Sequence, residues 1–186
     1  VGMKRRSRTS SNGSYVWLSL VVLVSASLAL GCAKNDVASS QPTTTPSPSG
    51  QQLPIEAVAI IGTQRFDLEV ARTTGQQRLG LMFRDPLPEA RGMLFPFDPP
   101  RPANFWMYNV TFPLDMVFML EGEVVHIEES VPGCSEQPCP SYGPPQTTLV
   151  DSVLELNGGT TNAIGLSVGD SIEVKFSDAE VAGDNS

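Results

Sequence analysis

Short stretches of the chain alternate between apolar and polar residues with a period of two. In Glu123–Val131, Val125 and Ile127 fall on one face of an extended chain, whereas His126 and Glu128 fall on the other. This alternation is typical of a half-buried strand. Other short runs rich in β-branched and aromatic residues, bounded by turn residues, predict further strands. The predicted strands are Glu56–Ile61, Phe66–Val70, Gly92–Phe97, Phe105–Asn109, Asp115–Leu120, Glu123–Val131, Val153–Leu156 and Ser171–Phe176.

Turns and two helical pieces separate these strands. Gly62-Thr63-Gln64 and Glu121-Gly122 are predicted hairpin turns, because glycine is common in tight turns. Thr73-Thr74 is predicted to cap a short helix over Gln76–Met82, and Thr160–Gly165 to form one helical turn that ends at a glycine. Many short strands with one or two short helices predict a compact, mainly β fold, a sandwich or a barrel.

The first 31 residues follow a different pattern. Four basic residues precede an uncharged apolar run over residues 15–30, and Gly31 closes the segment. A basic start, a short apolar centre and a small-residue exit are typical of a secretory signal peptide, predicted here over residues 1–31. The alternative is an uncleaved membrane anchor. Its length disfavours it, because a bilayer span needs about 20 apolar residues.

Cys32 follows this segment directly. The stretch LALGC at residues 28–32 resembles a bacterial lipobox, in which the cysteine is lipidated and becomes the mature N-terminus. The third residue before Cys32 is Ala29, where leucine is commoner. The resemblance implies an exported envelope lipoprotein anchored in the membrane through Cys32. Ala33 after it implies the outer membrane, facing the periplasm, in a cell with two membranes.

Composition divides the remaining chain into three parts. Residues 32–53 are rich in serine, threonine and proline, so we expect a disordered tether that projects the folded part from the membrane. Residues 54–176 are the predicted β domain. Residues 177–186 form a small, acidic tail that we also expect to be disordered.

The chain is acidic, with 12 basic and 20 acidic residues and a net charge of −8. Four of the basic residues and none of the acidic ones lie in the predicted signal peptide, so the mature chain is more acidic still. Because nucleic-acid binding needs a basic face, we expect no nucleic-acid partner. Arginines nevertheless gather in the first half of the β domain, either as a ligand-facing patch or as solvated partners of the many acids. They are Arg72, Arg78, Arg84, Arg91 and Arg101.

Two of the three cysteines lie close together in the stretch CSEQPC. Cys134 and Cys139 form an even pair once Cys32 is lipidated, and disulfides form and persist in exported proteins. A metal site is the alternative, but two soft ligands alone do not complete a tetrahedral site. We therefore predict a disulfide between Cys134 and Cys139.

Several longer stretches together resemble one known family. In chain order they are RTTGQQRLGLMFRDPLPEARGMLFPF, FWMYNVTFPLDMVFML, CSEQPCPSY, VLELNGG and GLSVGD. The set resembles the DUF192 family over about residues 56–175. The resemblance implies a jelly-roll-like β-sandwich, exported in many members, and it implies no activity. The resemblance implies Lys and Thr in many members where this chain has Tyr108 and Val110. If that lysine serves an anionic ligand, this chain lacks it.

The stretch FWMYNVTFPLDM provides the candidate binding residues Trp106, Met107, Asn109 and Asp115. An aromatic platform beside an amide and a carboxylate suits a polar ligand such as a sugar or a peptide. The structural alternative is that Asn109 and Asp115 bond the backbone of the turn before Pro113, as turn residues commonly do.

Metal and triad chemistry have little support. His126 is the only histidine, whereas a cupin-type metal centre needs several. A Ser-His-Asp triad would depend on the same residue, which lies in a strand without a nucleophile motif. Clustered methionines favour either Cu(I) binding or the filling of an irregular core, and we expect no metal and no cofactor. The methionines are Met82, Met93, Met107, Met116 and Met119.

Three hypotheses for function stay open. The favoured one is a non-catalytic, membrane-anchored module that binds a small ligand, a glycan or an envelope protein, because a catalytic set is missing. The second is an envelope hydrolase that uses Asp115 with Glu128 or His126. The third is a structural or assembly factor, which needs a partner and no pocket.

Overall fold

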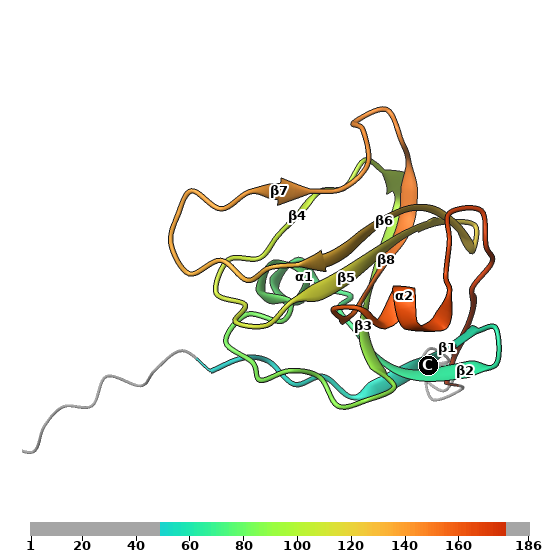
Figure 1. Ribbon diagram of the computed structural model, residues 1–186, viewed down its shortest axis with the longest axis horizontal. Coiled ribbons are helices and arrows are strands. Elements are labelled where there is room, and N and C mark those ends of the chain that lie inside the picture. Colours follow the sequence, from blue (N-terminus) through green and yellow to red (C-terminus); the bar gives the residue numbers. More distant parts are fainter. Residues whose placement is uncertain (1–48, 178–186) are drawn as a thin grey trace, which may run out of the picture. The chain divides into compact units, whose positions relative to one another are not determined.

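The computed structural model describes residues 49–177, so the predicted signal peptide, Cys32 and most of the predicted tether and tail lie outside it. Seven strands form one sheet in the order β6-β5-β8-β3-β2-β1-β9, and β4 and β7 form a small ribbon (Figure 1). The strands are β1 Ile55–Ile61, β2 Gln64–Val70, β3 Arg91–Arg101, β4 Phe105–Trp106, β5 Leu114–Leu120, β6 Glu123–Val131, β7 Ser141–Tyr142, β8 Val150–Asn157 and β9 Glu173–Phe176.

The large sheet curls until its two edge strands are joined. Residues 169–172 pair with the start of β6: the Val124 amide donates to the Asp170 carbonyl and the Ile172 amide donates to the Gly122 carbonyl, both at 2.8 Å. The same segment leads into β9, which pairs with β1 at the opposite edge. One end of the sheet is therefore closed as a half-barrel, which protects its edges.

Neighbouring strands are antiparallel except β2 and β3, which run parallel. A parallel pair needs a crossover connection, and α1 (Thr74–Leu79) lies in it. A capping box fixes the start of α1. The Thr73 side chain accepts a hydrogen bond from the Gln76 backbone amide, and the Gln76 side chain accepts one from the Thr73 backbone amide. The Gln77 side chain ties α1 to β3 by donating to the Pro96 carbonyl at 2.9 Å.

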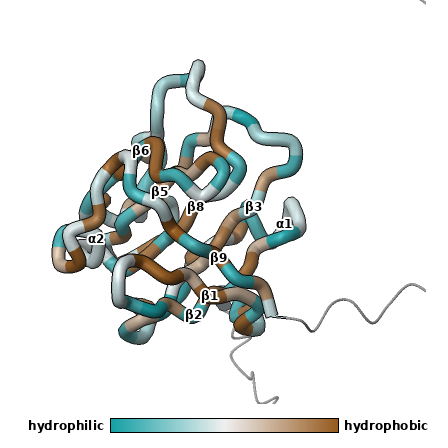
Figure 2. Tube along the Cα trace, turned by 90° about the vertical axis from the view of Figure 1, so that its right-hand side faces the viewer, coloured by the Kyte–Doolittle hydropathy of each residue, from teal (hydrophilic) through white to brown (hydrophobic). Residues whose placement is uncertain are grey.

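The central strands separate two hydrophobic cores. In β5, Met116 and Phe118 belong to the outer core, whereas Val117 and Met119 belong to the inner core. The inner core collects residues from both ends of the sheet and fills its curl, and the outer core lies between the sheet and the β4-β7 ribbon. Figure 2 shows apolar residues on the strands and hydrophilic residues along the connecting loops. Burial on both faces explains why the β5 sequence LDMVFML is almost continuously apolar.

The predicted fold class, mainly β with one or two short helices, is confirmed by the curled sheet, α1 and α2 (Thr160–Ile164). Both predicted hairpin turns are confirmed as well. At the second, Glu121 and Gly122 take positive φ angles of 53° and 80°, which a tight hairpin turn favours. No helix among the described residues is long and apolar enough to cross a membrane.

Several predicted boundaries differ from the structure. The first helix ends at Leu79 rather than Met82, because Gly80 takes a positive φ of 47° and ends it. β4 ends at Trp106 because the chain turns at Asn109, which has a φ of 58°. β3 continues to Arg101 beyond the predicted end at Phe97, and the two-residue strand β7 was not predicted.

The folded part begins before the predicted boundary at Pro54, within the predicted tether. The Gln51 side chain donates to two carbonyls at the end of α1 at 2.8 and 3.0 Å. The Leu53 amide donates to the Glu69 carboxylate at 2.8 Å. That carboxylate also accepts two bonds from Arg84, at 2.7 and 2.9 Å, with both side chains almost fully buried. The Glu69–Arg84 pair thus fastens β2, the loop after α1 and the start of the domain together.

Arg84→Ala is expected to lower the free energy of unfolding by about 3 kcal/mol, because it leaves a buried carboxylate without its main partner. Urea denaturation of the purified full chain measures the loss. Arg65→Ala is the control, since its pair with Asp67 is exposed and should contribute no more than about 0.5 kcal/mol. Equal losses for the two variants would contradict the assigned role of the buried pair.

Candidate functional site

Asp115, the acid of the predicted site, is fully buried and has a structural role. Its carboxylate accepts four hydrogen bonds: from the Ser130 amide at 2.7 Å, the Gly159 amide at 2.9 Å, and the Thr161 amide and hydroxyl at 2.7 and 2.8 Å. These bonds join β5 to the end of β6 and to the start of α2. A carboxyl group saturated in this way is not available to a ligand.

The other three candidates are one surface residue, one core residue and one turn residue. Trp106 is 45% exposed, whereas Met107 is fully buried in the outer core. Asn109 occupies a left-handed turn. Its backbone amide donates to the Cys134 carbonyl at 2.8 Å, and its backbone carbonyl accepts from the Phe83 amide at 2.8 Å. The structure therefore does not bring the four candidates together. Trp106 alone among them faces a cavity.

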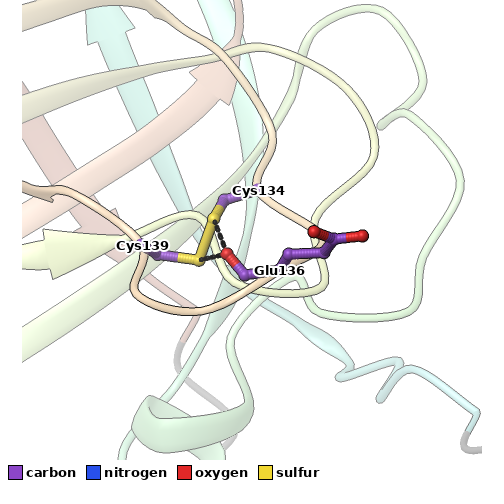
Figure 3. The surroundings of a disulfide bond; sticks show 3 residues. All are labelled: Cys134, Glu136 and Cys139. Carbon is purple, nitrogen blue, oxygen red and sulfur yellow. Dashed lines mark hydrogen bonds between the residues drawn. A yellow bond between two sulfur atoms is a disulfide. The ribbon is translucent and has the colours of Figure 1, made fainter.

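The predicted disulfide between Cys134 and Cys139 is confirmed, with the Cα atoms 6.0 Å apart. Figure 3 shows the backbone carbonyl of Glu136 lying against the two sulfur atoms while its side chain points away. The bridged loop packs against the turn at Asn109, and a Cβ on Gly133 would lie 2.2 Å from the Val110 carbonyl oxygen. This close approach explains a glycine there and fixes the disulfide loop beside β4.

The hydrolase pairing predicted from the sequence is not formed. Nε2 of His126 lies 3.0 Å from Oε1 of Glu128, which also accepts from the Gly143 amide at 3.1 Å. Glu128 pairs with Met116, so it lies on the outer face of the sheet, while Asp115 beside Met116 points to the opposite face. The sheet itself separates Asp115 from both residues, which is why they cannot act together.

Four of the five clustered methionines are core residues, and Met82 is half-buried. Met93, Met107 and Met116 lie in the outer core and Met119 in the inner core, on the other side of the sheet. Among the described residues, no three His, Cys, Asp or Glu side chains are grouped so that they could hold a metal ion.

A groove runs along α1 and ends at a buried carboxyl group. Three hollows of about 490, 250 and 30 Å³ follow one another, since neighbouring hollows share lining residues. We call them together the α1 groove. Its principal lining residues are Arg72, Thr74, Gln77, Arg78, Phe95, Phe97, Arg101, Asn104, Phe105, Trp106 and Glu155.

Glu155 lines the smallest hollow of the α1 groove. It is 4% exposed, and its side chain has no hydrogen-bond or ion-pair partner within residues 49–177. Its strand neighbours on either side are Met93 and Met116, which offer no hydrogen bond. Because burial disfavours the charged form, the pKa of Glu155 is raised from 4.5 to about 8. At neutral pH the carboxyl is therefore mostly protonated and can donate a hydrogen bond.

Arginines lie around the same groove. Arg78 lines both the smallest and the middle hollow, and Arg101 lines the two larger ones. The Arg101 guanidinium sits 4.0 Å above the centre of the Phe97 ring, which holds it at the groove wall. Arg72 lines the widest hollow and is paired with Glu56 at 3.0 Å. This local concentration of cations stands out on a chain with a net charge of −8.

Sequence reasoning missed Glu155, although a signal was present. In VLELN a charged residue sits inside a predicted core strand, and buried acids are uncommon unless they are paired. Nothing local indicates that α1 covers this position, because the contact joins residues far apart in the chain. Of the predicted arginine patch, Arg72, Arg78 and Arg101 line the groove.

Comparisons with known proteins agree with the fold. A family model, DUF192, described as Uncharacterized ACR, matches residues 57–174, a range that includes the principal lining residues of the α1 groove. A crystal structure of a protein of unknown function from Novosphingobium aromaticivorans DSM 12444 is similar, with a TM-score of 0.56 and 30% identity, covering 69% of this chain and 94% of that one. A candidate transcription regulator from Sinorhizobium meliloti 1021 is similar too, with a TM-score of 0.56 and 32% identity, covering 64% of this chain and 92% of that one. The comparison with curated proteins found no match.

Asp115→Ala is expected to lower the free energy of unfolding by about 3–5 kcal/mol, because it leaves buried amides without an acceptor. Urea denaturation measures the loss. Asp151→Ala is the matched control: its carboxylate accepts the Glu121 amide at an exposed turn, and we expect a loss of no more than about 1 kcal/mol. A stable Asp115→Ala variant would show that the residue does not hold β5, β6 and α2 together.

Glu155→Gln is expected to stabilise the protein in a pH-dependent way. Protonation of Glu155 favours the folded state at low pH, and this contribution is lost as the pH rises from 4.5 towards about 8. The free energy of unfolding of the variant should therefore match that of the original chain near pH 4.5 and exceed it by about 3–5 kcal/mol above pH 8. Urea denaturation at a series of pH values tests this. A difference that does not change with pH would refute the buried, unpaired state of Glu155.

Proposed function

The chain belongs to the DUF192 family, whose members are described as uncharacterised, and we propose that it is a membrane-anchored binding module of the bacterial cell envelope. In this proposal the α1 groove holds a small polar ligand, and the β domain contributes no catalysis. The groove lies within the part of the chain that the family model matches, so the proposal concerns a feature of the family domain.

One observation carries the proposal: Glu155 is 4% exposed, its carboxyl has no protein partner within residues 49–177, and its oxygens remain reachable from the small hollow that it lines. A buried polar group without a hydrogen bond lowers stability by about 1–3 kcal/mol. The presence of such a group next to a groove is better explained by a ligand that completes the hydrogen bond than by a structural need. Ionisable groups perturbed by burial in a cleft are common at functional sites.

Binding is favoured over catalysis by what surrounds Glu155. General acid–base chemistry needs a second group of suitable position and pKa. The smallest hollow contains one other ionisable side chain among the described residues, Arg78, which does not act as a base. Asp98 lines only the widest hollow, beside Arg72 and Arg101. The carboxyl of Glu155 therefore serves as a hydrogen-bond donor in this proposal.

The envelope location rests on the sequence and on the cysteines. The predicted signal peptide and Cys32 provide the membrane anchor, which is the membrane partner in this proposal. The Cys134–Cys139 disulfide supports an oxidising compartment, where such bonds persist. A groove on a tethered domain is accessible to small molecules, glycans and peptides of the envelope.

A role in DNA binding, which the similar structure from Sinorhizobium meliloti 1021 brings to mind, has weaker support. Binding of DNA phosphates requires a basic face. This chain carries 20 acidic and 12 basic residues, and three of its arginines line a groove rather than a flat surface. We therefore propose no nucleic-acid partner.

Native mass spectrometry tests the proposal on the full chain, extracted from its own envelope in mild detergent. We expect a non-covalent adduct that disappears on denaturation and that falls severalfold in occupancy with Trp106→Ala. Leu149→Ala is the control, because this side chain is 48% exposed, similar to the 45% of Trp106, and lies outside the groove. An adduct that Trp106→Ala leaves unchanged, or no adduct at all, would count against binding in the groove.

A further inference from the structure

We infer that the α1 groove takes a small ring-bearing carboxylate, with the carboxylate group between Glu155 and Arg78 and the ring beside Trp106. The inference rests on the proposed function and names the chemical class of its ligand. It is drawn from the sizes of the hollows, the charges that line them and the hydrogen bond that Glu155 lacks.

The sizes of the hollows divide the ligand into a head group and a body. The smallest hollow holds about 30 Å³, which admits the oxygens of a head group and no ring. The adjoining hollow holds about 250 Å³, and Phe97, Phe105 and Trp106 line it together with Arg101. Flat aromatic walls of this kind favour a planar body that stacks against them. The ligand therefore has a compact head group on a ring.

The charges at the deep end select an anionic head group. Arg78 is exposed, lines both the smallest and the middle hollow, and has no protein ion-pair partner within residues 49–177. A cationic head group would meet this guanidinium and Arg101 beyond it, which disfavours binding. A carboxylate instead forms a charge-assisted pair with Arg78, and guanidinium and carboxylate geometries match well.

Glu155 supplies the second contact because it is protonated. Burial raises its pKa to about 8, so at neutral pH its hydroxyl donates a hydrogen bond to the bound carboxylate. The groups that face it do not compete. Met93 on β3 and Met116 on β5 have no charge, and Arg78 is the only other ionisable residue in the described lining of that hollow. An ionised Glu155 would repel the ligand, so affinity should fall once Glu155 loses its proton.

Trp106 offers a direct readout. The full sequence has two tryptophans, and Trp17→Phe leaves Trp106 as the only one. The probes are benzoate, benzamide and benzylamine, which share a ring and differ in the charge of the head group. In the full chain with Trp17→Phe, in detergent at pH 7, benzoate should change the Trp106 fluorescence with at least tenfold higher affinity than benzamide. Benzylamine should bind more weakly than either.

The pH dependence and two variants complete the test. Benzoate affinity should fall about tenfold for each pH unit above 8. Glu155→Gln should remove that fall, because the amide donates at every pH. Arg78→Gln should weaken benzoate binding at least tenfold and leave benzamide unchanged, whereas Arg65→Gln, outside the groove, should change neither. Circular dichroism confirms that each variant is folded.

Different experimental outcomes would contradict this inference and the proposed function. Preference for benzylamine, or benzoate affinity that rises with pH, would overturn the carboxylate assignment and still support a binding groove. Failure of all three probes, alongside an envelope adduct that depends on Trp106, would overturn only the ligand class. Failure of the probes together with absence of any such adduct would overturn both.

Discussion

A sheet that is buried on both faces offers a carboxyl group in its middle few polar partners. This constraint governs both central acids, Asp115 on β5 and Glu155 on β8, which lie close to each other in the paired strands but point to opposite faces. Asp115 is saturated by four protein hydrogen bonds and holds β5, β6 and α2 together. Glu155 receives no such partner and is neutral at pH 7, because burial raises its pKa. The same chemical group thus has a structural role on one face and lacks a protein hydrogen-bond partner on the other.

The outer layer of the fold forms a groove beside the carboxyl of Glu155. Because β2 and β3 are parallel, the chain must cross over between them, and the crossover brings α1 onto the outer core. β4 forms part of the opposite wall, and Phe105 packs edge-on against Phe95 and Phe118 at 5.0 and 6.0 Å. The helix and the ribbon do not meet completely. The space between them leads from the surface to Glu155.

The charge of the groove does not come from the position at which many family members carry a lysine. Tyr108 stands there and packs beside Trp106, with the ring centres 5.5 Å apart. The cations come instead from Arg78 on α1 and Arg101 at the end of β3. A groove that attracts anions on an acidic protein favours discrimination between ligands by charge, because the surrounding surface repels anions that do not reach it.

The sequence by itself determined the mainly β class, both hairpin turns, the cap at Thr73 and the disulfide, because each depends on neighbouring residues and on local backbone preferences. It did not determine the parallel pairing of β2 and β3, the second face of β5 or the position of α1 over Glu155, because these depend on contacts between distant segments. The predicted site residues show the same limit, because the side chains of Asp115 and Asn109 suit either a ligand or the fold. Only the tertiary structure, by giving Asp115 four partners and Glu155 none, decided which acid is free to bind.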